Sequence, residues 1–140
     1  MFIHPTPKPA LKTAISILSD AFGEYAQVSA KMPSRAPERF VRVSRIGGSR
    51  PFIVTDTAKM LIECFGPDPE TVEAMCATVD EAMHNAIGTV VDDAVFVRGW
   101  ENISGPTDFP HPDLLSWDRW QINGDLLVST STPSSAPPGS

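Results

Sequence analysis

The residue types best suited to chemistry gather in one Pro-rich stretch, where Ser104, Asp108, His111 and Asp113 follow one another at short intervals. A hydroxyl, an imidazole and carboxylates are the groups of a nucleophile–base–acid set, or of a site for a hard metal ion. No nucleophile elbow accompanies them, and a proline flanks His111 on each side. We therefore interpret the stretch as a rigid, exposed arm that contacts another subunit. A small metal-dependent hydrolase is the alternative.

Other patterns match ligand sites only in part. The histidines are isolated in sequence and share no metal-ligand spacing. Gly47-Gly48 before Arg50 lacks the helix start with Lys or Thr that a phosphate-binding loop requires, so we interpret the glycines as a hairpin turn. Cys64 and Cys76 have neither zinc-knuckle spacing nor the density of a disulfide scaffold, and we expect buried free thiols. The sequence thus predicts no catalytic residue, no metal and no cofactor.

A cluster of arginines stands out in a chain whose formal net charge is −6. Arg39, Arg42, Arg45 and Arg50 fall in or beside one expected strand, to which they give a basic face, and Arg pairs bidentately with carboxylates and phosphates. Three interpretations stay open: a solvated strand face, contact with an acidic neighbour, and contact with DNA. In a ring of identical subunits the acidic neighbour would be the outer face of the helix that begins near Asp68, because a head-to-tail interface joins two different patches.

Composition limits the classes of protein. With 140 residues, of which 41% are hydrophobic and 20% charged, the chain suits one globular domain. The acidic balance argues against a main role in binding duplex nucleic acid, which needs surplus Lys and Arg. No run approaches the ~20 apolar residues that cross a bilayer, and residues 1–9 lack the pattern of a signal peptide. We expect a soluble protein that is not exported and has no membrane partner.

The periodicity of apolar residues predicts a helix, three strands, a second helix and two or three further strands. Gly23 suits a left-handed stop after the first helix. Asp68 and Pro69 form a strong start for the second helix, since Asp caps free amides and Pro fits the first turn. The expected elements are a helix over 10–22, strands over 26–32, 39–46 and 58–64, a helix over 69–87, and strands over 95–100, 117–122 and 125–128.

Glycine and proline predict the turns and irregular segments. Asn123-Gly124 suits a tight hairpin turn between the last two strands. Residues 104–113 contain three prolines and are expected to be irregular. We expect an extended segment over 1–9 and a disordered Ser/Pro-rich tail over 129–140. Between them, residues 10–128 are expected to form a single α+β domain, a mainly antiparallel sheet of five to six strands with two helices packed on one face.

Three stretches, taken in order, resemble the tail terminator proteins of siphoviruses, especially those of phages that infect actinobacteria. The first is Arg42-Val-Ser-Arg-Ile-Gly-Gly-Ser-Arg50, similar to the family's strand that ends in a double glycine before Val54-Thr-Asp56. The second is Met60-Leu-Ile-Glu-Cys-Phe-Gly, followed by the capped helix. The third runs from Trp100 to Asp113, with a Gly-Pro and then a Pro-Asp pair, and continues in the strand Arg119-Trp-Gln121.

The resemblance covers roughly residues 10 to 128 and implies a small, non-enzymatic α+β virion protein. Such a subunit assembles in the host cytoplasm as a hexameric ring, caps the head-proximal end of the tail tube and ends tube polymerisation. Its partners are copies of itself, the tail-tube protein and the head–tail connector protein, and DNA passes through the ring without sequence-specific contact. A head-closure or neck protein of the same virion is the closest alternative. The expected contact residues are Arg39, Arg42, Arg45, Arg50, Asp108, Phe109, His111, Asp113 and Arg119.

Overall fold

The computed structural model describes residues 10–35, 37–52, 55–93, 95–108 and 118–129, and for 49–52 and 55 it describes the backbone alone. These residues form two helices and six strands. In chain order the elements are α1 (Ala10–Phe22), β1 (Gln27–Ser29), β2 (Phe40–Phe52), β3 (Thr55–Gly66), α2 (Pro69–Asn85), β4 (Val90–Val91), β5 (Val95–Asp108) and β6 (Asp118–Ser129). The segment expected to be extended over 1–9 lies outside the described residues, and so does the expected disordered tail over 129–140 apart from its first residue. For Ser129 that expectation is wrong, because the residue ends β6 and is buried.

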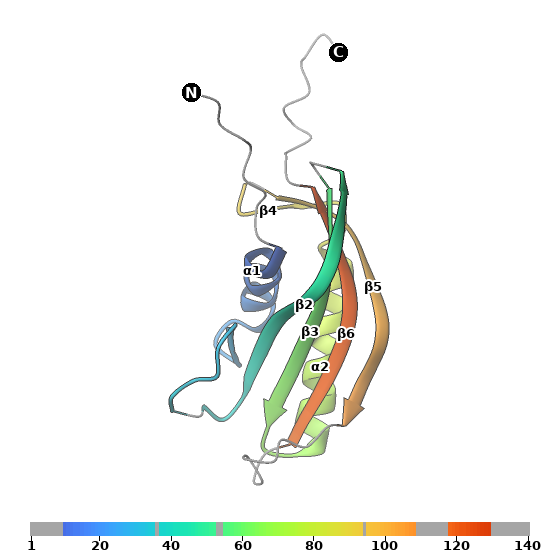
Figure 1. The fold of residues 1–140 in the computed structure, drawn as a ribbon. Coiled ribbons are helices and arrows are strands. Elements are labelled where there is room, and N and C mark those ends of the chain that lie inside the picture. Colours follow the sequence, from blue (N-terminus) through green and yellow to red (C-terminus); the bar gives the residue numbers. More distant parts are fainter. Residues whose placement is uncertain (1–9, 36, 53–54, 94, 109–117, 130–140) are drawn as a thin grey trace.

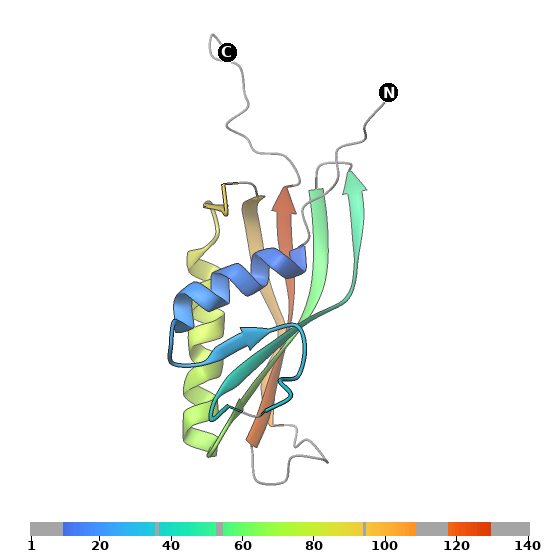
Figure 2. The same cartoon turned by 90° about the vertical axis from the view of Figure 1, so that its left-hand side faces the viewer.

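The strands form one sheet in the order β1-β2-β3-β6-β5-β4. β1 pairs with β2 in parallel, and the other neighbours are antiparallel. Both helices lie against the same side of the sheet; α2 runs along the strands and α1 crosses them (Figures 1 and 2). We call this side the helix face and the other side the far face. The expected α+β class, with a mainly antiparallel sheet and helices on one face, is confirmed.

The core lies between the helix face and the two helices. Alternate residues of the central strands point into it, because side chains along a strand alternate between its two faces. Each helix adds one apolar stripe. The fully buried members include Leu18, Val41, Val43, Ala58, Met60, Ile62, Cys64, Val72, Val79, Met83, Ile122 and Leu126. The prediction that the two cysteines are buried free thiols is also confirmed.

Both helices begin and end close to their predicted signals. Gly23 follows α1 with a φ of 55°, in the left-handed region. At the start of α2, Oδ1 of Asp68 accepts a hydrogen bond from the backbone N–H of Thr71 at 2.8 Å, the geometry of an N-cap. α2 ends at Asn85, so Ile87, predicted to be in its buried stripe, lies beyond the helix and is 40% exposed.

The predicted hairpin turn at Gly47-Gly48, and the connecting stretch predicted after it, are wrong, because β2 continues through both glycines. The glycines directly follow a bulge at Ile46, marked by a register shift between Arg45 and Gly47. Gly48 has a φ of 128°, and a Cβ at this position would lie 2.1 Å from the carbonyl oxygen of Thr57. Close approach of the neighbouring strand therefore explains the glycine better than a turn does.

The irregular segment predicted from Ser104 onward is wrong as far as Asp108, because β5 includes these residues. The register between β5 and β6 shifts between Ser104 and Thr107. Pro106 lies within this shift, where the regular ladder is interrupted and a missing N–H donor is tolerated. Residues 109–113, the rest of the predicted irregular segment, lie outside the described residues.

The predicted hairpin turn at Asn123-Gly124 is also wrong, since both residues lie in the middle of the continuous strand β6. A Cβ on Gly124 would lie 2.2 Å from the ring of Trp100. The indole Nε1 of Trp100 in turn donates to Oδ1 of Asp80 on α2 at 3.0 Å. Gly124 thus makes room for a large side chain between the sheet and α2.

The outermost strands are short. β1, predicted over 26–32, is confined to three residues, and β4, which the periodicity does not predict, has two. Long stretches of β2 and β5 therefore extend beyond their edge partners.

Candidate assembly surface

Three charged side chains on the far face connect three strands. Nε of Arg42 in β2 donates to Oε1 of Glu63 in β3 at 2.6 Å, and Nη1 of Arg119 in β6 donates to Oε2 of the same carboxylate at 2.7 Å. The side chain of Glu63 is only 2% exposed, that of Arg119 10% and that of Arg42 26%. The carboxylate is therefore held between two guanidinium groups, one of which reaches water. We call this set the far-face cluster.

A pair of aromatic rings packs beside the far-face cluster. Phe40 and Phe65 are direct partners in the β2–β3 ladder. Their rings stack with centroids 4.3 Å apart and an interplanar angle of 9°, and both side chains are buried. Because Phe40 alternates with the core residue Val41, the rings lie on the side away from the helices. The far face thus has a small packed layer of its own.

A second ion pair lies on the helix face. Arg45 donates from Nη1 to Oδ2 of Asp56 at 2.6 Å and from Nη2 to Oδ1 at 2.8 Å, a bidentate geometry. Asp56 is 3% exposed and Arg45 32%. The hydrogen bond to Asp56 is the main reason that the pKa of Arg45 is raised, and burial opposes it. This pair joins β2 to β3 beside the core.

Arg39 anchors the loop that follows α1. Its Nε donates to the backbone oxygen of Tyr25 at 2.7 Å, and its guanidinium lies 4.1 Å from the centroid of the Tyr25 ring, a cation–π contact. Nη1 also lies 3.1 Å from the carboxylate of Glu38. The loop is therefore tied to the start of β2.

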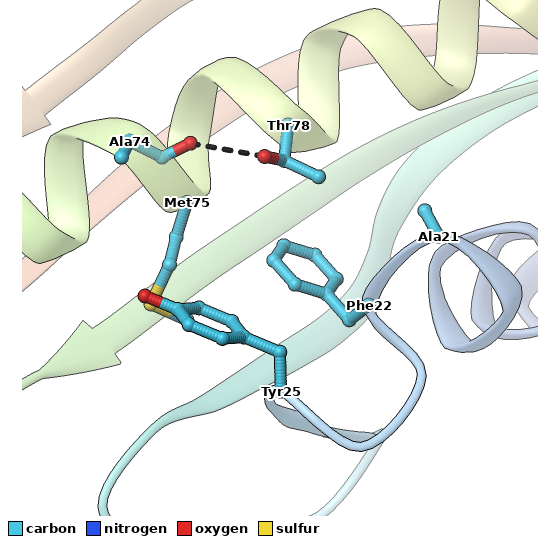
Figure 3. A pocket seen from close by; sticks show the side chains of 6 residues that line it. All are labelled: Ala21, Phe22, Tyr25, Ala74, Met75 and Thr78. Carbon is cyan, nitrogen blue, oxygen red and sulfur yellow. Dashed lines mark hydrogen bonds between the residues drawn. The ribbon is translucent and has the colours of Figure 1, made fainter.

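Tyr25 also borders a hollow of about 270 Å³ between the end of α1 and α2. Figure 3 shows Phe22 and Tyr25 facing Met75 of α2. The hydroxyl of Thr78 is used within α2, where it donates to the carbonyl of Ala74 at 3.1 Å. The side chains that line this hollow carry no charge and no activated nucleophile, so the hollow offers packing rather than chemistry.

The arginines predicted as one basic strand face are divided among three places, so the predicted single face is wrong. Arg42 and Arg45 are three residues apart, and an odd separation along a strand puts side chains on opposite faces. Arg42 shares the far-face cluster with Arg119, Arg45 pairs with Asp56 on the helix face, and Arg39 holds the loop. The acidic partners thus come from the same chain.

The other residues predicted as contacts are less closely defined. Asp108 is exposed at the end of β5. Arg50 lies in β2, where the backbone alone is described, and Phe109, His111 and Asp113 lie outside the described residues. Their role at an interface stays a prediction, and so does the hydrolase alternative.

Glu63 and Asp56 are the site residues that sequence reasoning missed. For Glu63 a signal was present: its i±2 neighbours on the same strand face are Leu61 and Phe65, so a carboxylate stands within an apolar row and needs a buried partner. Asp56 precedes the apolar alternation of β3 by two residues and shares its face, a weaker signal of the same kind.

Within the described ranges, no group of three or more His, Cys, Asp or Glu side chains is placed to hold a metal ion. No helix among the described elements has the length and apolar character to span a membrane.

No protein-family model matches the chain, and no curated protein is significantly similar to it. Among solved structures, the fold is similar to that of a chain in the virion of a native gene transfer agent particle, with 11% sequence identity and a TM-score of 0.48. The match covers 81% of this chain and 85% of that chain. A likeness this distant carries no argument about function.

Proposed function

We propose that this protein is a structural subunit of a phage virion, a tail terminator that forms a ring on the last ring of tail-tube protein and ends tube growth. The proposal starts from the three stretches that resemble tail terminators, and it is supported by the far-face cluster. Arg42 comes from the first stretch, Glu63 from the second and Arg119 from the third. Stretches far apart in the sequence thus supply one buried ionic group.

The meeting of the three stretches at the far-face cluster gives the sequence resemblance a physical basis. A carboxylate buried between two arginines is costly to desolvate, and removing one partner leaves an uncompensated buried charge. Charged residues in such a set therefore constrain one another, and the cluster aligns β2, β3 and β6. Three stretches that resembled the family only by chance would not be expected to place one charged residue each in the same ionic group.

The shape of the subunit suits a part that must present two different surfaces. The strands run along the length of the molecule (Figure 1). The end at which β2 leads into β3 and the opposite end, at which α2 begins, are therefore separate surfaces with different residues. A growing tube exposes on each ring the template for the next ring. A terminator matches that template at one end and presents a different surface at the other, so it acts by differential affinity and performs no reaction.

The test is to polymerise the tail-tube protein of the same virion with rising amounts of this protein and to measure tube length by electron microscopy. We expect shorter tubes that carry a ring at one end only. An unrelated protein of similar size and net charge serves as the control. Tubes of unchanged length with bare ends would contradict the proposal, and ring binding to the head–tail connector protein alone would favour the neck alternative.

A further inference from the structure

We infer that copies of this protein join edge to edge, with the outer edge of β2 in one copy added to the outer edge of β5 in the next. The inference rests on the proposed ring and names the surfaces that would form it. Four observations carry it: two open strand edges, their common level in the sheet, an exposed isoleucine on each, and the directions of the strands.

Both edges are open over long stretches of the described residues. β1 pairs with β2 only as far as Arg42, so Val43–Phe52 has no strand partner on that side. On the opposite side, β4 pairs with the first two residues of β5, and Val97 exchanges backbone hydrogen bonds with Gly88 and Thr89 at 2.8 and 2.9 Å. From Arg98 to Asp108, β5 has no strand partner on its outer side. Unpaired edges of this kind are templates for another strand.

The register places the two open edges at the same level. Ser49 pairs with Thr57, Thr57 with Leu127, and Leu127 with Gly99, so Ser49 and Gly99 share one row across the sheet. Val43 is level with Ile122. The rows from Thr57 to Ile62 of β3, six in all, are therefore open on both sides, a length on the order of 20 Å at ~3.3 Å per residue.

The two short outer strands lie at opposite ends of these open rows. β1 covers β2 before Val43, and β4 covers β5 before Arg98, which is at the other end because β2 and β5 run in opposite directions. In a row of copies, β1 of one subunit and β4 of its neighbour would flank the seam from its two ends.

An exposed isoleucine stands on each edge near the middle of the open rows. Ile46 is 56% exposed and Ile103 is 54% exposed. Both border the same shallow hollow, together with Lys59 and Asp125. A single exposed apolar side chain needs no explanation. Two of them at one level, one on each open edge, would meet across the seam and leave water together.

The directions of the strands fit such a seam without further adjustment. The four long strands alternate in direction, so β5 is antiparallel to β2. Rotation about an axis along the strands preserves direction, and the β2 of the next copy therefore meets β5 as an antiparallel neighbour. The contact is head-to-tail, and repetition of such a contact closes into a ring when the rotation permits.

Because both edges carry a bulge, the seam depends strongly on the contact between the two isoleucines. Register shifts lie at Ile46 in β2 and at Ile103 in β5, and bulges interrupt a hydrogen-bonded ladder. A seam here has short ladders on either side of an apolar contact. A charge at either isoleucine should therefore open it.

The test measures the mass of wild-type protein, of Ile46→Asp and of Ile103→Asp in solution by analytical ultracentrifugation. We expect a closed oligomer for wild type and a monomer for each variant. An equimolar mixture of the two variants should give a 1:1 dimer, because the first keeps an intact β5 edge and the second an intact β2 edge. Ala77→Asp, which adds the same charge on the exposed outer face of α2, should leave the oligomer unchanged.

Circular dichroism tests whether each variant is folded. If an aspartate variant is unfolded, Ile46→Ser or Ile103→Ser is measured in its place. A variant that keeps the wild-type mass, a mixture that stays monomeric, or a wild type that is monomeric at every concentration overturns the seam. The tube-capping measurement separates this from the proposed function. Wild-type rings that cap tubes while Ile46→Asp still assembles would refute the seam alone. If both variants open the ring, but wild-type protein leaves the tube ends bare, the terminator role alone is refuted.

Discussion

Nη1 of Arg119 lies 2.7 Å from Oε2 of Glu63, although the two residues are 56 positions apart in the chain. In the β3–β6 ladder Arg119 is the direct partner of Phe65, so it reaches Glu63 diagonally. Arg42 is the direct partner of Glu63 on the other side. One direct and one diagonal neighbour thus hold the same carboxylate, and both kinds of cross-strand pair lie within reach of long side chains.

Replacing Glu63 with Gln should therefore destabilise the fold. The variant removes the negative charge between two guanidinium groups, and removal of one partner from a buried ion pair costs about 3 to 5 kcal/mol. We expect the lower end of this range, since Arg42 reaches water and can be solvated. Urea unfolding followed by circular dichroism measures the change in the free energy of unfolding.

Asp125→Asn is the matched control for Glu63→Gln. Asp125 pairs with Lys59 on the same face at 3.8 Å, and Lys59 is 58% exposed. Exposed pairs of this kind contribute about 0 to 1 kcal/mol, so this variant should change stability little. Equal losses for both variants would show that the burial of Glu63 does not distinguish it from a surface carboxylate.

Asp68→Ala should lower the free energy of unfolding by about 1 kcal/mol, the usual effect of losing an N-cap side chain. The carboxylate accepts hydrogen bonds from the backbone N–H and from the hydroxyl of Thr71, at 2.8 and 3.0 Å. Asp68→Asn keeps an acceptor oxygen and should recover most of the loss. Thermal or urea unfolding of the three proteins provides the comparison, and an Asn variant as unstable as the Ala variant would argue against capping as the cause.

The elements predicted well are those with local signals. α1 has a regular apolar stripe before Gly23, α2 has its cap and proline, and β3 has a strict alternation of buried residues. The errors come from glycine and proline. Gly48 and Gly124 suggested turns because glycine favours them, yet each is required by a neighbour distant in sequence, Thr57 in one case and Trp100 in the other.

The candidate site was predicted only in part, for a related reason. The residue type of Arg42 and Arg119 was informative, but their shared partner Glu63 depends on the register of two strand pairs. That register is set by contacts between segments that no local pattern relates. The opposite orientation of Arg42 and Arg45, in contrast, follows from strand periodicity alone and was predictable from their spacing.

Gly124→Ala should be destabilising by about 1 to 3 kcal/mol, the usual cost of overpacking. The new methyl group would displace the ring of Trp100 and disturb its hydrogen bond to Asp80, so we also expect a change in tryptophan fluorescence. Gly99→Ala is the control, because a Cβ there meets the Cβ of Leu127 at an ordinary 3.8 Å. Similar behaviour of both variants would contradict the role assigned to Gly124.

The thiol of Cys64 should resist modification in the folded protein. A hydrogen bond with Cys76 and complete burial both raise the pKa of Cys64 well above its usual value. The thiolate is the reactive form, and a free thiol with a pKa of about 8.5 is largely ionised at pH 9. We expect a disulfide reagent at pH 9 to modify native protein only as fast as it unfolds. In urea the reaction should be complete within minutes.

Ser19→Cys provides the control for access and reagent, since Ser19 is exposed on α1 and its thiol should react at once. The raised pKa also fixes a pH dependence of stability. Above about pH 8.5 the unfolded chain releases the Cys64 proton while the folded chain retains it, so the free energy of unfolding should fall as the pH rises. Cys64→Ala should weaken that dependence. Rapid modification of both native thiols in the wild-type protein would mean that β3 and α2 separate far more readily than their packing indicates.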